Sequence, residues 1–285
     1  MSENGERESQ ERFDWYKVNS LLLDIGNTAA DLKMKPTDMV HLGGSAMFYR
    51  CYQAFGPKAV SHFRGTHDMD LLCFNRGAVQ RVLDVLMTSE DSAVEQYSVG
   101  NSSSLPNKRS FYIELKRQNL PGSSTGFEID VYESEKNEII FNERVMNRNK
   151  LVLDPPEELK LPTLNPQKDR GLVTVPSLRD AFIVKMDIMD FSYSGLRLKD
   201  SIDILTTLSV CQALDCSFES LLSAIVEANK LEPALRKLGA LEALFRDPQR
   251  IVGKANLDNP FIPSDEIIKS ALESVRKYRR KLTSH

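Results

Sequence analysis

The apolar positions in the N-terminal part of the chain follow helical and strand periods in turn. Apolar residues recur at helical spacing through residues 15–34, which predicts a helix that Gly26 weakens. A short apolar run at residues 39–42 ends at a Gly-Gly pair, and helical spacing resumes over residues 45–55. We therefore predict a strand, a glycine turn and a helix in succession.

A second strand and helix follow, and after them two strands in which apolar and polar residues alternate. Residues 68–74 are typical of a strand, and residues 77–88 place their apolar side chains on one helical face. In residues 109–117 and 126–132 apolar and polar positions alternate, so each predicted strand has one buried and one polar face. The loop at residues 118–125 contains proline, glycine and serines, which favours an antiparallel hairpin.

The pattern changes after Leu151. Prolines cluster between residues 155 and 166 and predict a wrapping segment, and helical periodicity dominates from Pro176 to the end. We predict an α+β fold, in which a mixed-sheet lobe over residues 12–175 precedes an α-helical lobe over residues 176–285. The polar residues 1–11 are expected to be disordered.

Composition and charge narrow the class of protein. Of the 285 residues 41% are hydrophobic and 27% are charged, which is typical of a globular protein. A net charge of −3 excludes a strongly basic, non-specific nucleic-acid binder, so any nucleic-acid contact needs a local patch. The N-terminus lacks the apolar core of a signal peptide and no long apolar run occurs, so we expect a soluble, cytoplasmic protein without a membrane partner.

The four cysteines lack zinc-ligand spacing and are interpreted as buried thiols in a reducing compartment: Cys51, Cys73, Cys211 and Cys216.

Three carboxylates form the first candidate for chemistry. Asp68 and Asp70 are two apart on a predicted strand, so both project from the same face. Asp130 lies on the polar face of another predicted strand, which could bring it beside the first two. Such carboxylates repel one another unless a cation lies between them, and Mg²⁺ prefers a few carboxylate oxygens with its other positions left to water or phosphate. Taken alone, an Asp-x-Asp pair more often marks a solvated strand end.

The glycine turn is the second candidate. Gly43, Gly44 and Ser45 lie between a predicted strand and a predicted helix, where small residues let phosphate approach the backbone and the helix N-terminus supplies N–H groups. We expect Ser45 to cap that helix and to donate its hydroxyl to a phosphate oxygen. An ordinary tight turn explains the turn in isolation, but not its combination with the carboxylates.

These two motifs resemble a known family. The chain reads Leu42-Gly43-Gly44-Ser45-Ala46 and then Arg64-Gly65-Thr66-His67-Asp68-Met69-Asp70-Leu71. This order is similar to the signature of the DNA-polymerase-β-like nucleotidyltransferase superfamily, in particular its AbiEii-type toxin branch. The resemblance implies a nucleotidyltransferase catalytic lobe, Mg²⁺ held by Asp68 and Asp70, and nucleotide held by the glycine turn and Arg64. His67 has no second histidine placed to complete a site and is interpreted as structural.

A later region resembles the same branch. It reads Leu178-Arg179-Asp180-Ala181-Phe182-Ile183-Val184-Lys185 and then Arg197-Leu198-Lys199-Asp200-Ser201-Ile202-Asp203-Ile204. Lys185 shares the apolar face of its helix, so it faces either an anion or, by snorkelling, the solvent. Lys199 and Asp203 are four apart, which is ordinary ion-pair spacing unless their face lines a cleft that binds phosphate. The resemblance leaves Asp130 and Asp203 as alternatives for the third carboxylate.

The carboxylates and the glycine turn together predict an activity on nucleotides. The leading hypothesis is transfer of NMP from an NTP to an acceptor hydroxyl; the resemblance implies a tRNA 3′ end as acceptor and a toxin that an antitoxin protein controls. A small molecule or protein acceptor, a metal-dependent phosphodiesterase and a non-catalytic nucleotide-binding protein stay open. A C-terminal basic run could hold RNA, although a solvated helix end is the simpler interpretation: Arg276, Lys277, Tyr278, Arg279, Arg280 and Lys281.

Overall fold

The computed structural model describes two compact units of the chain. One comprises residues 1–139 and 150–177, and the other residues 140–149 and 178–285. The described residues are 18–35, 38–63, 68–73, 77–90, 92–101, 108–115, 126–133, 138–140, 150–152, 157–161, 171–190, 198–248 and 261–284. The expected disordered segment, residues 1–11, lies outside them.

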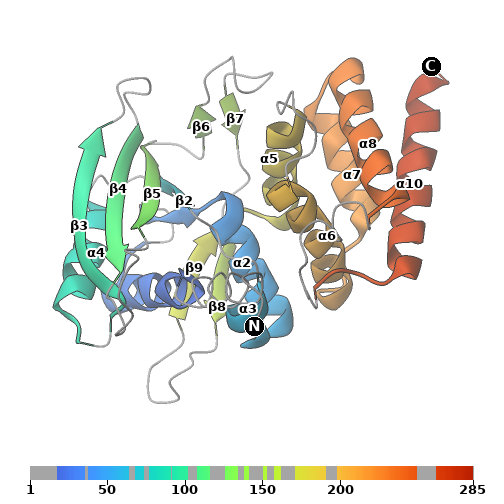
Figure 1. Cartoon of the computed structure of the whole chain (residues 1–285). Helices are drawn as coiled ribbons and strands as arrows, with labels where there is room; N and C mark the ends of the chain where they lie inside the picture. The colour runs from blue at the N-terminus through green and yellow to red at the C-terminus, as the bar shows by residue number, and fades with distance from the viewer. Residues whose placement is uncertain are drawn as a thin grey trace, which may run out of the picture. The chain divides into compact units, whose positions relative to one another are not determined.

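A mixed seven-stranded sheet organises the first unit, with the strand order β3-β4-β5-β2-β1-β9-β8 (Figure 1). The central pairs β2·β5 and β1·β9 are parallel, and the other neighbouring pairs are antiparallel. A separate two-stranded sheet pairs β6 with β7. The strand bounds are β1 Val40–His41, β2 Asp68–Cys73, β3 Val94–Asn101, β4 Lys108–Leu115, β5 Gly126–Glu133, β6 Glu138–Ile140, β7 Lys150–Val152, β8 Glu157–Leu161 and β9 Gly171–Val175.

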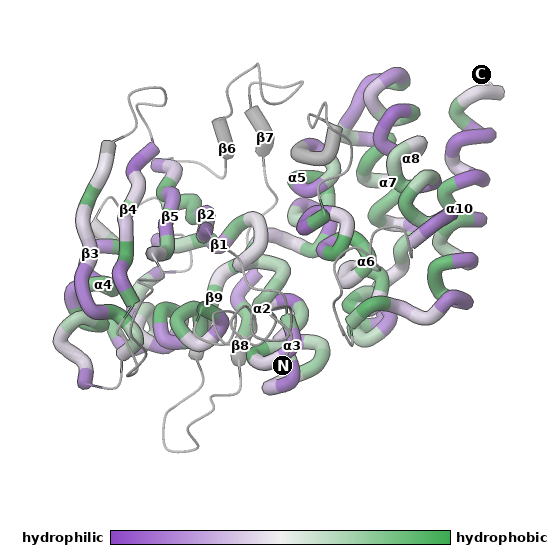
Figure 2. Tube along the Cα trace, viewed as in Figure 1, coloured by the Kyte–Doolittle hydropathy of each residue, from purple (hydrophilic) through white to green (hydrophobic). Residues whose placement is uncertain are grey.

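The alternation in β2, β4 and β5 gives the sheet one apolar face and one polar face. Met69, Leu71, Phe111, Ile129 and Val131 are all buried on the apolar face. Hydrophilic residues recur between these apolar ones along β4 and β5 (Figure 2). Because a strand repeats every two residues, the polar positions share the opposite face.

The helices of the first unit pack around this sheet. Residues 18–31 are helical, and a Cβ at Gly26 would lie 2.4 Å from Cγ1 of Val173 on β9. The glycine that weakens the helix locally is therefore what allows its close approach to the sheet. The other helices of this unit are α2 Gly43–Phe55, α3 Lys58–His62 and α4 Ala78–Thr88.

Helix α2 is held in place by polar contacts from its buried face. The Tyr49 hydroxyl donates to the carbonyl of Leu22 at 2.5 Å. Arg50 is buried, donates to the carbonyl of Pro176 at 2.6 Å and pairs with Glu157 on β8 at 2.7 Å. The Arg50 contacts are charge-assisted and therefore the stronger ones, and they attach the middle of α2 to β8 and to the residue after β9.

The second unit is helical. Its elements pack as a bundle in which α10 lies along α8 and α7 (Figure 1). Their bounds are α5 Leu178–Asp190, α6 Leu198–Ala213, α7 Phe218–Ala228, α8 Leu231–Arg246 and α10 Asp265–Thr283. The expected α+β class, a mixed sheet followed by helices, is confirmed.

The predicted elements of the sheet are confirmed except on its flanks. The antiparallel pairing of residues 108–115 with 126–133 is confirmed, as are β1, α2, β2 and α4 near their predicted bounds. No strand was predicted at β3 or β9, and β8 lies in the proline-rich stretch that was predicted to be a wrapping segment. Three of the four cysteines are buried as expected, and Cys216 is exposed.

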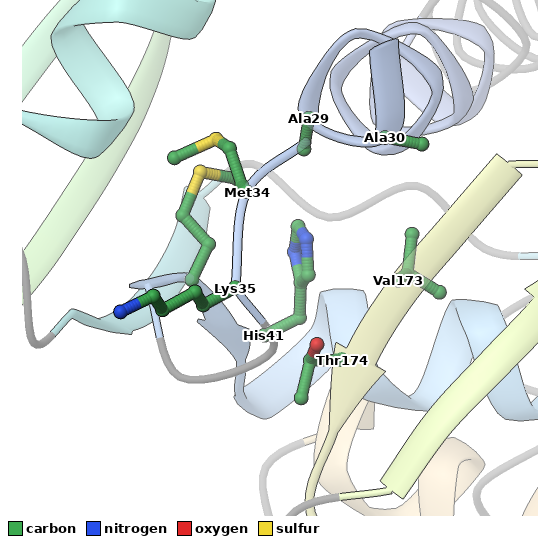
Figure 3. A pocket seen from close by; sticks show the side chains of 8 residues that line it. Ala29, Ala30, Met34, Lys35, His41, Val173 and Thr174 are labelled. Atoms are coloured by element: carbon green, nitrogen blue, oxygen red, sulfur yellow. The ribbon is translucent and has the colours of Figure 1, made fainter. Parts of the chain in front are cut away.

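His41 on β1 occupies a buried pocket behind the sheet. Its ring points between residues Ala29 and Ala30 of the N-terminal helix and Val173 and Thr174 of β9 (Figure 3). The imidazole is 1% exposed, its Nδ1 has no hydrogen-bond partner, and it meets the Tyr49 ring edge-on at 4.7 Å. Burial lowers the pKa of His41 to about 3.

This buried imidazole predicts a pH-dependent stability. Between pH 6.5 and about pH 3 the unfolded chain binds a proton at His41 that the folded chain does not, so the free energy of unfolding rises with pH over this interval. We expect His41 to contribute a slope of about 1.4 kcal/mol per pH unit between pH 4.5 and 5.5. Urea unfolding of the wild-type protein and His41→Leu across these pH values measures it. Equal slopes for the two proteins would contradict the assignment.

Candidate active site

Two rows of polar side chains cross the polar face of the sheet. Asp70 of β2 is in register with Asp130 of β5, which is in register with Ser110 of β4. In the next row Asp68 is in register with Glu128, and Glu128 with Tyr112. Because residues in register on neighbouring strands project from the same face, four carboxylates share this part of the sheet.

Asp130 is the best-defined member of these rows. Its Oδ1 accepts a hydrogen bond from the Ser110 hydroxyl at 2.6 Å, and Lys108 Nζ lies 2.5 Å from its Oδ2. The Lys108 ammonium also lies 5.9 Å from the centre of the Tyr132 ring. A cation therefore already compensates one carboxylate, which is expected where like charges are crowded.

The four carboxylates of these rows raise the pKa of the Tyr132 phenol. Burial raises the pKa of its phenol, and neighbouring carboxylates raise it further because they disfavour a second negative charge. These carboxylates are, in decreasing order of effect, Asp70, Asp130, Asp68 and Glu128. The same four residues that the strand register aligns thus act on one phenol.

The glycine turn meets the carboxylates at Asp70. The Leu42 amide donates to the Asp70 carbonyl at 2.8 Å, and α2 begins at the next residue, Gly43. Gly43 has φ +55°, and a Cβ there would lie 2.7 Å from Oδ2 of Asp70. Position 43 therefore needs glycine for its backbone angle and for the space that the Asp70 carboxylate occupies.

The N-terminus of α2 is free of acidic side chains. No acidic residue occupies its first turn, and Leu42 at the N-cap position makes no side-chain capping bond. The first amides of a helix have no partner within the helix and carry the positive end of its dipole. An anion brought to Asp70 would therefore meet backbone donors rather than competing carboxylates of this helix.

The expected capping role of Ser45 is wrong. Leu42 holds the N-cap position, and Ser45 lies inside the first turn of α2, where its hydroxyl donates to the Leu42 carbonyl at 2.8 Å. Ser45 is fully buried. The helix begins at Gly43, two residues earlier than predicted, so Ser45 lies past the N-cap position and its hydroxyl donates to a backbone carbonyl.

The donor set of the rows fits a hard divalent cation. All four side chains offer carboxylate oxygens, which Mg²⁺ prefers, and the unfavourable repulsion among them would be relieved by a cation. Among the described residues, no group of three or more His, Cys, Asp or Glu side chains lies close enough, as they stand, to hold a metal. Asp130 is turned to Lys108 and Ser110, so it would have to leave Lys108 to join a site at Asp70.

Two predicted residues of this region lie outside the described ranges, and one carboxylate of the rows was not predicted. Arg64 and His67 lie outside the described residues, so their expected roles stay predictions. Glu128 was missed, although its spacing of two from Asp130 on an alternating strand places it on the same face.

Lys185, Lys199 and Asp203 lie in the second unit. The Lys185 ammonium is buried and lies 2.6 Å from Oδ2 of Asp203 and 3.3 Å from Oδ1 of Asp200, so this lysine faces carboxylates. Both aspartates are fully buried on α6. Lys199 is half-buried at the start of α6, and Asp203 pairs with Lys185. Of the two alternatives for Lys185, an anion or the solvent, the structure shows an anionic partner, and it lies within the second unit.

The C-terminal basic run is largely engaged with glutamates. Arg276 Nε lies 3.2 Å from Glu242, and Arg279 also pairs with Glu242. Hydrogen bonds from Arg279 lower the pKa of the Glu242 carboxyl, with smaller effects of Arg276 and Arg246. The Tyr278 hydroxyl donates to the Glu219 carbonyl at 3.3 Å. These side chains therefore connect α10 to α8 and α7.

Comparison with known proteins gives a structural likeness but no sequence match. No protein-family model matches the chain, and no curated protein matches it. A solved structure from H. pylori, described as a "putative nucleotidyltransferase", aligns over 100% of this chain and 98% of its own, with a TM-score of 0.46 and 13% sequence identity. A likeness at this level carries no residue roles or activity over to this chain.

Within the described residues, no helix is both long and apolar enough to cross a bilayer.

A substitution at Gly43 separates backbone strain from the space beside Asp70. Gly43→Ala is expected to cost about 1–3 kcal/mol of stability from its positive φ, and also to displace the Asp70 carboxylate. Gly56→Ala is the matched control, because Gly56 has φ +65° and nothing within 4 Å of its added Cβ. Thermal unfolding should show destabilisation in both variants, whereas catalytic activity should fall only in Gly43→Ala. Equal activity of the two variants would contradict a functional role for this contact.

Proposed function

We propose that this chain is a Mg²⁺-dependent nucleotidyltransferase, which transfers NMP from an NTP to an acceptor hydroxyl. The observation that carries the proposal is the alignment of Asp70 with Asp130 on parallel strands, with the N-terminus of α2 directly beside Asp70. A phosphodiesterase would use the carboxylates but has no need of a phosphate-binding turn. The combination favours transfer from a triphosphate.

Each part of this arrangement has a distinct task. Asp68, Asp70 and Asp130 would hold Mg²⁺, with Glu128 in register beside Asp68 as a further carboxylate. The first-turn amides of α2, at Gly43 and Gly44, would donate to the triphosphate. Bound Mg²⁺ would supply charge neutralisation and activation of the acceptor oxygen.

The reaction is an in-line displacement. The acceptor hydroxyl gives up its proton to water, its oxygen forms a bond to the α-phosphorus, the bond from this phosphorus to the bridging oxygen breaks, and pyrophosphate leaves. The Ser110 hydroxyl holds Asp130, so Ser110 is a positioning residue in this account, whereas Lys108 would have to release Asp130 before it could hold Mg²⁺. Arg64 remains a candidate for contact with the nucleotide, and the expected roles of Lys185, Lys199 and Asp203 stay predictions.

The acceptor has two candidates. The resemblance to AbiEii-type toxins supports a tRNA 3′ end, with the chain acting as a toxin under the control of an antitoxin protein. A different observation favours a small molecule. A cavity of about 650 Å³ on β3, β4 and β5 is lined in part by Tyr112, Glu114 and Glu128.

The charge of this cavity favours a small-molecule acceptor over RNA. Its described lining includes two glutamates and no lysine or arginine, and Glu128 also belongs to the row of Asp68. A polyanion such as RNA would be repelled there, whereas a hydroxyl compound that carries an amine would be attracted. Its volume is within the range of small-molecule sites.

A transfer assay distinguishes these acceptors. Purified protein is incubated with Mg²⁺ and each α-labelled NTP, together with total tRNA, with a pool of amino sugars and amino alcohols, or alone to detect self-modification. Label in tRNA supports the toxin proposal, and label in the amine pool supports the small-molecule proposal. The absence of label from all of them, with no Mg²⁺-dependent binding of any NTP, would overturn nucleotidyl transfer.

A further inference from the structure

Two cysteines meet where α6 ends in the second unit. Asp215 has φ +54°, the Cys216 amide donates to the Cys211 carbonyl at 2.7 Å, and the Asp215 amide donates to the Gln212 carbonyl at 3.4 Å. This pair of hydrogen bonds defines a Schellman motif, in which the side chains of the two outer residues commonly contact each other. Here those outer residues are Cys211 and Cys216.

The backbone geometry satisfies the main requirement for a disulfide. With the Cys216 N and the Cys211 O at 2.7 Å, standard bond lengths limit the separation of the two Cα atoms to about 6.6 Å. Disulfides form at Cα separations of about 4.4–6.8 Å. The Cα separation across this turn therefore does not exceed the range that a disulfide bridges.

The two thiols differ in accessibility. Cys216 is exposed and Cys211 is 3% exposed, and both line one cavity of about 490 Å³ between α6, α7 and α10. Burial raises the pKa of Cys211 to about 12, and the nearby Cys216 contributes to the increase. An oxidant that enters the cavity would therefore meet the Cys216 thiol first, with Cys211 behind it as a protonated thiol.

We propose that Cys211 and Cys216 form a reversible disulfide, which makes the α6–α7 turn a site of oxidation by hydrogen peroxide. In the first step the Cys216 thiolate attacks a peroxide oxygen, the O–O bond breaks and the departing hydroxide takes a proton to give water. In the second step the Cys211 sulfur attacks the Cys216 sulfur, the S–O bond breaks and a second water leaves with the thiol proton. Two thiols are oxidised by two electrons, and one peroxide is reduced to two waters.

Mass spectrometry tests this assignment directly. No lysine or arginine lies between residues 200 and 230, so trypsin releases both cysteines on one peptide, apart from Cys51 and Cys73. After treatment of the full chain with hydrogen peroxide and denaturing alkylation, we expect this peptide to lose the mass of two hydrogen atoms and to escape alkylation. Reduction with dithiothreitol should restore both alkylation sites.

Single substitutions assign the order of the two thiols. Cys211→Ser should stop the reaction at a sulfenic acid on Cys216 that dimedone traps, whereas Cys216→Ser should yield neither product. Cys73→Ser is the control, and it should retain the disulfide. Intact alkylation of both thiols after peroxide, dimedone labelling on Cys211, or a disulfide that links two chains through Cys216 would each overturn the proposal.

Discussion

Replacement of Asp70 by Asn is expected to lower the rate of nucleotidyl transfer by roughly 10³-fold, the magnitude typical of losing one group that stabilises transition-state charge. Asp70 lies at the meeting point of the site: it is in register with Asp130 and its carboxylate fills the space beside Gly43. Asn keeps the shape of the side chain but removes the negative charge that would hold Mg²⁺. The rate is measured as labelled acceptor formed per enzyme per minute.

The stability of the Asp70 variant is part of the same prediction. Asp70 lies among Asp68, Asp130 and Glu128, so the loss of its charge relieves repulsion, and we expect the thermal midpoint to be unchanged or raised. Asp84→Asn, on the exposed side of α4, is the matched control and should retain full activity. A fully active Asp70→Asn protein would remove these carboxylates from the reaction.

Replacement of Lys185 by Met is expected to destabilise the second unit by about 3–5 kcal/mol. The Lys185 ammonium lies between Asp203 at 2.6 Å and Asp200 at 3.3 Å, and both aspartates are fully buried. Without the lysine, two carboxylates would lie close together away from water with less compensation of their charge. The change is measured by chemical denaturation of the full chain at pH 7.

An exposed lysine provides the control for this substitution. Lys277 is 71% exposed and lies 3.7 Å from Glu219, so Lys277→Met should cost no more than about 1 kcal/mol. The double variant Lys185→Met with Asp203→Asn should recover part of the lost stability, because one uncompensated charge is removed. If Lys185→Met were as stable as Lys277→Met, the buried ion cluster would not be a stabilising element.

The sequence predicts the centre of the sheet better than its edges. Alternation in residues 126–132 is regular because β5 is buried on one face and polar on the other, so both the strand and its pairing with β4 follow. In the strand β9 the residues Val173, Thr174 and Val175 are all buried, so the strand lacks the alternation by which the other strands were predicted, and it lies beside a proline-rich stretch. Only pairing with β1 and β8 makes it a strand.

The sequence likewise predicts some features of the candidate site and not others. The alternation rule places Asp68 and Asp70 on one face, but sequence does not give the register that aligns Asp70 with Asp130 and Asp68 with Glu128. The contact of Gly43 with Asp70 likewise depends on how α2 leaves β1. Ser45 was assigned the wrong role because the start of a helix is set by backbone angles, which Gly43 changes in a way that residue types do not reveal.

The central claim is that the carboxylates serve nucleotidyl transfer, and the fate of the two labels of one NTP tests it most directly. The NTP carries one label at the α-phosphorus and another at the γ-phosphorus, and it is incubated with Mg²⁺, an acceptor pool and either wild-type protein or Asp70→Asn. The account predicts α-label in the acceptor and an equal amount of γ-label in pyrophosphate, with both lost in Asp70→Asn. Transfer of γ-label to the acceptor, or release of γ-label as free phosphate without any labelled acceptor, would contradict it.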